Sequence, residues 1–155
     1  ARYYYYDNRA DPSALNSLRL YAWRTKFHSL ALQHNISPQW RVMAQLMDGS
    51  TDMGPNIVQA DFTAWYIAAR YFKNQHSVTA RYDWFDVRED DNLPIDQNDS
   101  DGYGITVAWR YQIDSNWEVG AEYHYNKNSA ANRIQLDLPI EQTQSQSRFV
   151  LSFQF

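Results

Sequence analysis

Strict alternation of apolar and polar side chains is the feature that most constrains how this chain can fold. In residues 102–113, every odd position is apolar or aromatic, from Tyr103 to Ile113, while the even positions carry Gly, Thr, Ala, Arg and Gln. Residues 117–125 repeat the pattern, with Glu, Gly and His at the even positions. Successive side chains of a β-strand point to opposite faces of the sheet. The period of two therefore predicts strands with one apolar and one polar face.

Short turns at 114–116 and 73–76 join such runs into hairpins and set which residues face each other. In both hairpins the resulting register places apolar residues opposite apolar residues on one face. The expected pairs include Val107 with Tyr123 and Trp65 with Trp84.

A third hairpin is expected around the turn at 35–38, with Leu32 near Trp40. Farther from this turn, Lys26 and His28 fall on the apolar face. We therefore expect either a β-bulge or an exit from the buried zone at that point.

The chain as a whole reads as about eight strands joined by alternately short and long connections. The long polar connections are expected at 7–16, 49–59, 88–101 and 127–144. This pattern predicts an all-β fold, an antiparallel up-and-down β-barrel. The strands are expected at 2–6, 17–34, 39–48, 60–72, 77–87, 102–113, 117–126 and 145–155.

Composition favours a barrel in a membrane over a soluble β-sandwich that binds carbohydrate through Trp and Tyr. Aromatic residues make up 16% of the chain, yet its mean hydropathy is -0.69. Aromatics stand at the ends of the apolar strand faces, with Ala and aliphatic residues between them, as in an interfacial aromatic belt. The net charge of -4 argues against nucleic acid as a partner, and the absence of Cys rules out disulfides.

The last seven residues, 149–155, read FVLSFQF and end on the apolar face of the final strand. This run resembles the C-terminal signature of Gram-negative outer-membrane proteins, and the neighbouring hairpins resemble the last strands of porin-like, substrate-selective barrels. The resemblance implies location in the cell outer membrane, contact with the lipid bilayer and lipopolysaccharide, and recognition by the barrel assembly machinery. Phe149, Phe153 and Phe155 would form that assembly signal.

Porins of this kind have about 16 strands, twice the number expected here. Eight strands can close, but their interior is just wide enough to be filled by side chains. Because the chain begins in the middle of a strand, we expect residues 1–155 to be the C-terminal strands of a larger transmembrane barrel.

The polar strand faces carry residues that would line the lumen of such a barrel, where charged rings set ion selectivity. Five of them are Arg, whose planar fork suits phosphate and carboxylate, which hints at a preference for anions. The alternative is that these residues pair across strands, as Arg110 could with Glu122, and only brace the wall. The candidate lumen-lining residues are Arg41, Arg70, Arg81, Asp83, Arg110, Glu118, Glu122, His124 and Arg148.

Catalysis and metal binding find little support in the sequence. The acidic segment 86–101 could bind Ca²⁺ or bridge to lipopolysaccharide, but a solvated external loop is the simpler interpretation. Ser29, His28 and Asp48 could be combined into a hydrolase triad, although no spacing singles them out. We therefore expect no enzyme, no cofactor and no metal site.

The leading hypothesis is a porin-like channel for passive diffusion of small polar or anionic solutes. A small structural or adhesive barrel that conducts nothing is the second hypothesis. A soluble, carbohydrate-binding β-domain is the third.

Deletion of Phe155 tests the predicted assembly signal. We expect the shortened protein to assemble poorly, because the terminal aromatic would be part of the recognised strand. The yield of folded protein, followed by its heat-modifiable migration, measures this effect. Normal yield and normal migration would contradict the prediction.

Overall fold

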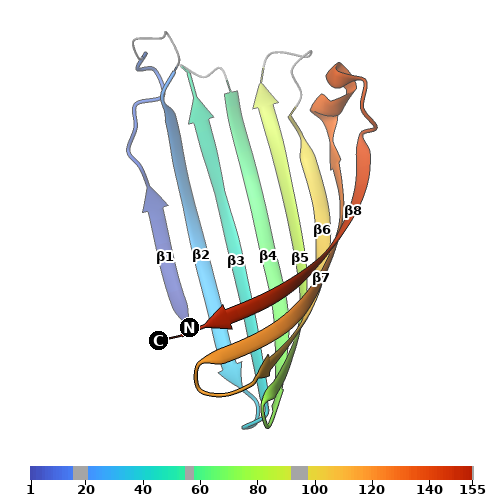
Figure 1. The fold of residues 1–155 in the computed structure, drawn as a ribbon. Helices are drawn as coiled ribbons and strands as arrows, with labels where there is room; N and C mark the ends of the chain where they lie inside the picture. Colours follow the sequence, from blue (N-terminus) through green and yellow to red (C-terminus); the bar gives the residue numbers. More distant parts are fainter. Residues whose placement is uncertain (16–20, 55–57, 92–97, 155) are drawn as a thin grey trace.

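The computed structural model describes residues 1–155 apart from 16–20, 55–57, 92–97 and 155. The described residues form one antiparallel sheet in which eight strands follow one another in chain order (Figure 1). The predicted all-β, up-and-down architecture is therefore confirmed. The strands are β1 (Arg2–Asp7), β2 (Trp23–Asn35), β3 (Trp40–Met53), β4 (Val58–Lys73), β5 (His76–Asp91), β6 (Ser100–Gln112), β7 (Trp117–Ala130) and β8 (Glu141–Phe153).

Two of the predicted hairpins have the predicted register. In β6–β7, Val107 pairs with Tyr123. In β4–β5, Trp65 pairs with Trp84, and the two indole rings stack with their centroids 6.2 Å apart. Matching apolar side chains on one face is thus enough to set the register of a tight hairpin.

The register predicted for the β2–β3 hairpin is wrong. Leu32 pairs with Ala44. Across the turn, Trp40 faces Ile36, and the Ile36 N–H donates to the Trp40 carbonyl. Pro38 explains the shift, because proline has no N–H to give to a strand ladder and so takes the centre of the turn. The pairing from Trp23 to Asn35 is continuous, so Lys26 and His28 leave the apolar zone without a bulge.

The strands extend farther into the long connections than predicted. β3 runs to Met53, β5 to Asp91 and β7 to Ala130, while β8 already begins at Glu141. Backbone pairing needs no apolar side chain, so the ladder continues where the alternation of hydrophobicity has ended. β2, in contrast, begins at Trp23 and not at 17, and residues 16–20 lie outside the described part of the chain.

A 3₁₀ helix, η1 (Ala131–Leu136), lies in the connection between β7 and β8 and ends at Asp137, whose φ of 53° is left-handed. Among the described residues, no helix has the length and apolar character needed to cross a membrane.

The sheet is curved, and Figure 1 shows β7 and β8 sweeping round from the flatter part formed by β1 to β5. Residues paired in register share a face, so each row of partners can be followed from strand to strand. The convex face carries the apolar positions, including Leu46, Trp65, Trp84 and Tyr103, which form one such row. The concave face carries the polar positions of the same strands.

The described residues contain almost no hydrophobic core. Ala68, on the concave face, is their one buried hydrophobic residue. On the convex face, Trp65 is 38% exposed, Val107 45% and Ile67 56%. In a soluble barrel these side chains would meet in a dry centre. Here they form an apolar band on the convex face, and no other described part of the chain covers it.

Candidate functional site

All nine predicted lumen-lining residues lie on the concave face, and six strands, β3 to β8, supply them. Four of them belong to one row of register partners that crosses the sheet, in the order Arg41, Arg70, Thr79, Ala108, Glu122 and Arg148. The others occupy the adjacent rows of the same face. These residues are Arg81, Asp83, Arg110, Glu118 and His124.

Seven of the nine line a single hollow of about 670 Å³ on this face. Arg41 lies beside it, in a neighbouring hollow near the turn that contains Pro38. The remaining residue, Arg148, stands directly opposite Glu122 on β8. The structure therefore gathers residues that are distant in sequence into one wet, charged surface.

Arg110 is the centre of an ion-pair network on the concave face. Its guanidinium lies 3.4 Å from Glu122 and 3.8 Å from Glu118, as the sequence suggested for the first of these. Gly120 makes room for this arrangement, because a Cβ there would come within 2.4 Å of Arg110 Cδ. The network is partly shielded from water and holds Arg110 flat against β7.

Arg81 is also neutralised by a neighbour. It pairs with Asp83, its second neighbour on the same face of β5, and its guanidinium lies 4.0 Å from the centre of the Tyr66 ring. In the same row of register partners, His124 Nδ1 shares a 2.9 Å hydrogen bond with the Thr106 hydroxyl. These contacts fix both side chains against the wall.

The concave face is not polar along its whole length. Toward the long connections, Tyr6, Phe27 and Phe62 form an aromatic cluster, with ring centroids 5.2 and 6.4 Å apart. The cluster packs over Gly49, where a Cβ would lie only 2.4 Å from that of Phe27. Sequence reasoning missed this cluster, and the one available signal was an aromatic at a position of β2 that alternation assigns to the polar face.

Two of the three predicted assembly residues, Phe149 and Phe153, lie on the convex face of β8. Phe149 is 90% exposed, whereas Phe153 packs against Trp117 with ring centroids 4.7 Å apart. Phe155 lies outside the described residues. A role for these residues in assembly stays a prediction.

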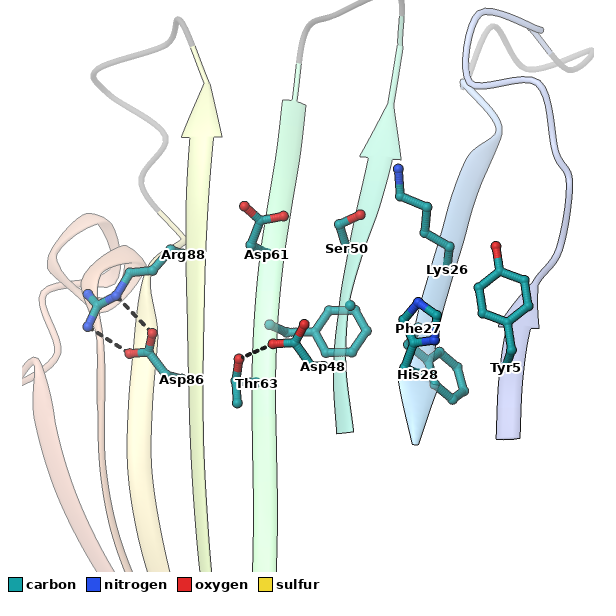
Figure 2. A pocket seen from close by; sticks show the side chains of 12 residues that line it. Tyr5, Lys26, Phe27, His28, Asp48, Ser50, Asp61, Thr63, Asp86 and Arg88 are labelled. Atoms are coloured by element: carbon teal, nitrogen blue, oxygen red, sulfur yellow. Dashed lines mark hydrogen bonds and ion pairs between the residues drawn. The ribbon is translucent and has the colours of Figure 1, made fainter. Parts of the chain in front are cut away.

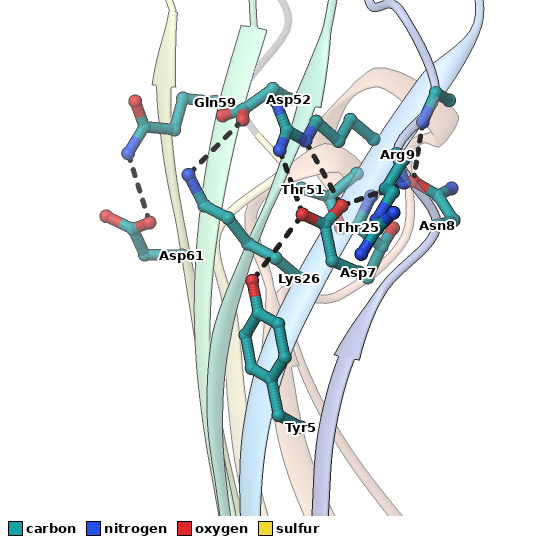
Figure 3. A network of polar contacts seen from close by, with 12 residues as sticks. Tyr5, Asp7, Asn8, Arg9, Thr25, Lys26, Thr51, Asp52, Gln59 and Asp61 are labelled. Carbon is teal, nitrogen blue, oxygen red and sulfur yellow. Dashed lines mark hydrogen bonds and ion pairs between the residues drawn. The ribbon is translucent and has the colours of Figure 1, made fainter.

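A belt of polar side chains continues the convex face beyond the apolar band, toward the long connections. In Figure 2, Asp86 pairs with Arg88 at 2.7 Å and Thr63 donates to Asp48 at 2.7 Å. Figure 3 shows the part of this outer polar belt nearest β1, where Lys26 lies 3.7 Å from Asp52. The ladder extends here although the apolar face has ended, so the barrel wall has a polar outer surface above the band.

Asp7 is the best-anchored carboxylate of the outer polar belt. It accepts hydrogen bonds from Arg24 Nη2 at 2.9 Å and Nε at 3.2 Å, and from the backbone N–H of Arg9 at 2.8 Å. The Arg24 guanidinium, followed by the Arg9 N–H, lowers the pKa of Asp7 to about 2. This ion pair ties the short strand β1 to β2.

The acidic segment forms no metal cluster among its described residues, and no group of three His, Asp or Glu side chains elsewhere in the described chain could hold an ion. Its carboxylates have other partners. Asp99 accepts from the Glu89 N–H, and Asp101 accepts from the Ser129 hydroxyl. Asp96 and its neighbours at 92–97 lie outside the described part.

The three residues that could be combined into a hydrolase triad do not lie on one face of the sheet. His28 and Asp48 are register partners on the convex face, where His28 Nδ1 lies 2.5 Å from the Tyr3 hydroxyl. Ser29 is the next residue along β2 and therefore points to the concave face, where it accepts a hydrogen bond from Gln45. Its hydroxyl cannot reach the imidazole.

The family model described as "Putative beta-barrel porin-2, OmpL-like" matches residues 3–155. No curated protein and no solved structure matches the chain.

Asp7 provides a test of the anchoring of β1. Because its folded pKa is depressed, its stabilisation is complete above the ordinary value of 3.8 and is lost as the pH falls toward about 2. We expect Asp7→Asn to speed hydrogen–deuterium exchange of the β1 amides at pH 5, and most of the difference from the unaltered protein to be lost near pH 2. Asp61→Asn, which removes a carboxylate bonded only to Gln59 in the described residues, should leave β1 unchanged. A difference that persists at pH 2 would contradict this account.

Proposed function

The chain belongs to the OmpL-like β-barrel porin-2 family, and we propose that it forms part of the wall of an outer-membrane channel. In this proposal the concave face lines a water-filled lumen through which small polar or anionic solutes diffuse passively. The polar residues of that face would set the preference of the channel among solutes.

One observation carries the proposal, namely the inverted distribution of polarity over the two faces of the sheet. Within the apolar band the convex side chains are exposed, with Ile67 at 56% and Val107 at 45%, while charged side chains line the hollow on the concave face. An apolar outer surface is stable only when lipid covers it, and a charged inner surface needs water. Transmembrane β-barrels satisfy both needs, and soluble barrels satisfy neither.

The dimensions of the apolar band support the same conclusion. On β6 the band is bounded by Tyr103 and Tyr111, and on β7 by Tyr125 and Trp117. Eight residues of strand span about 27 Å, or roughly 21 Å across a bilayer at a tilt of about 40°. With the aromatic side chains extending the span at each end, this height is close to the apolar band of about 25 Å that outer-membrane barrels present to lipid.

The connections give the orientation. In outer-membrane barrels the short turns face the periplasm and the long loops face outward. We propose that the turns after β2, β4 and β6 are periplasmic, and that the outer polar belt lies at the level of the lipopolysaccharide headgroups.

The edges of the sheet support a larger barrel. In the described residues β1 pairs only with β2, and β8 pairs only with β7. An unpaired edge cannot remain in the hydrocarbon layer, since its N–H and C=O groups would have no partners. We propose that the sheet is completed by further strands, as a C-terminal portion of a wider barrel.

Paired lysine substitutions test which face meets lipid. Val107→Lys places a charge at the middle of the apolar band and should destabilise the protein folded in a bilayer by about 2–4 kcal/mol. Ala108→Lys, one residue along, faces the lumen opposite Glu122 and should be nearly neutral. Urea titration of the full-length protein in lipid vesicles measures both. Equal cost at the two positions would contradict the assignment of faces.

Conductance tests the channel itself. We expect the full-length protein in planar bilayers to give stepwise ionic currents, with a reversal potential in a salt gradient that shows preference for chloride over potassium. Stable insertion without current would favour the non-conducting structural barrel. A protein that stays dispersed at high concentration without detergent would favour the soluble carbohydrate-binding domain.

A further inference from the structure

Two arginines of the concave face are brought together without a compensating acid. Arg41 on β3 and Arg70 on β4 are direct register partners, so their side chains leave the sheet side by side. Like charges directly opposite each other destabilise a strand pair. In the described part of the chain neither guanidinium forms an ion pair with a carboxylate, whereas Arg81 and Arg110 both do.

Neutral groups hold the two guanidiniums in place. Arg41 Nε donates to the side-chain oxygen of Asn35 at 3.0 Å, and Arg70 Nη2 donates to the buried Ser77 hydroxyl at 3.0 Å. Both guanidinium carbons also lie over the ring of Phe72, at 5.5 and 4.5 Å from its centre. The pair is therefore oriented before any ligand arrives, while its two positive charges remain uncompensated.

Arg70 carries a further sign of a missing partner. Its Nε is buried and has no hydrogen-bond acceptor among the residues that the structure describes. Leaving a buried donor without an acceptor destabilises a protein by more than an ordinary hydrogen bond stabilises it. The three acids that line the same hollow already have cations, because Asp83 is paired with Arg81, and Glu118 and Glu122 are both paired with Arg110.

We propose that Arg41 and Arg70 form a binding site for a soluble oxyanion of the phosphate type, with the Phe72 ring beside it. Planar guanidiniums bind such oxyanions through two parallel N–H···O bonds, so a phosphate between them would cancel their repulsion. Chloride offers no such pair of acceptor oxygens. The inference rests on the proposed function, since it takes the concave face as the lumen, and it adds a discrete anion site at the turn end of that lumen.

Single neutralising substitutions with a matched control test this site. The full-length protein in planar bilayers is expected to carry chloride current, and inorganic phosphate is the probe added to it. We expect phosphate to reduce the current, and Arg41→Gln or Arg70→Gln to raise the half-inhibiting phosphate concentration at least about tenfold. Arg81→Gln removes the same charge from the same face, but Arg81 is already paired with a carboxylate. This variant should change the half-inhibiting phosphate concentration less than about threefold.

The conservative variant separates a fork-shaped site from simple charge. Arg70→Lys keeps the positive charge but cannot form two parallel hydrogen bonds. We expect it to retain chloride conductance and to lose most of the phosphate effect. Heat-modifiable migration reports whether each variant has folded.

A second measurement keeps the site testable apart from conduction. Isothermal titration of the detergent-folded full-length protein with inorganic phosphate should show binding that Arg70→Gln abolishes and Arg81→Gln preserves. The oxyanion site would be contradicted if the channel conducts but phosphate does not reduce its current, or if Arg70→Gln and Arg81→Gln lose phosphate binding equally. Neither result would contradict the proposed channel. Phosphate binding without any current would overturn the channel instead.

Discussion

An unbroken antiparallel ladder assigns a face to every described side chain of this sheet, and the rest of the structure depends on it. Because pairing is continuous from Trp23 to Asn35 and along the strands that follow, no bulge exchanges the two faces. The apolar residues consequently form one outward band with a polar belt beside it, and the charged residues at the level of the band form one inward surface. Stability comes from backbone hydrogen bonds and from contacts within each face, since the described residues bury almost no hydrophobic core.

Within the concave face, ion pairs and the small residues that make room for them determine which arginines are neutralised by a carboxylate. Gly120 lets Arg110 lie flat between two glutamates, and Asp83 neutralises Arg81. These contacts brace the wall, which is the alternative that the sequence had left open for the whole set. Arg41 and Arg70 differ, because their anchors are uncharged. The same face thus combines a structural network with two adjacent arginines that form no ion pair with any described carboxylate.

The sequence predicted the strands, the two faces and the registers of two hairpins, because all of these follow from local periodicity and from short turns. It failed at the β2–β3 turn, where Pro38 occupies the centre and shifts the pairing. It also ended several strands too early, since hydrophobic alternation stops before backbone pairing does. The aromatic cluster around Phe27 broke the alternation, and only the packing over Gly49 gives it a reason.

By itself, the sequence determined which side chains share a face, because neighbours along a strand must alternate whatever the rest of the chain does. The tertiary structure decided which of them stand side by side where the sequence shows no short turn. β3 and β4 are joined by residues 54–57 alone, but the alternation of hydrophobicity stops well before this connection, so the sequence pattern did not predict that Arg41 faces Arg70. The tertiary structure also decided that the charged face is the concave one, because curvature arises from the twist and coiling of the whole sheet and not from any single strand.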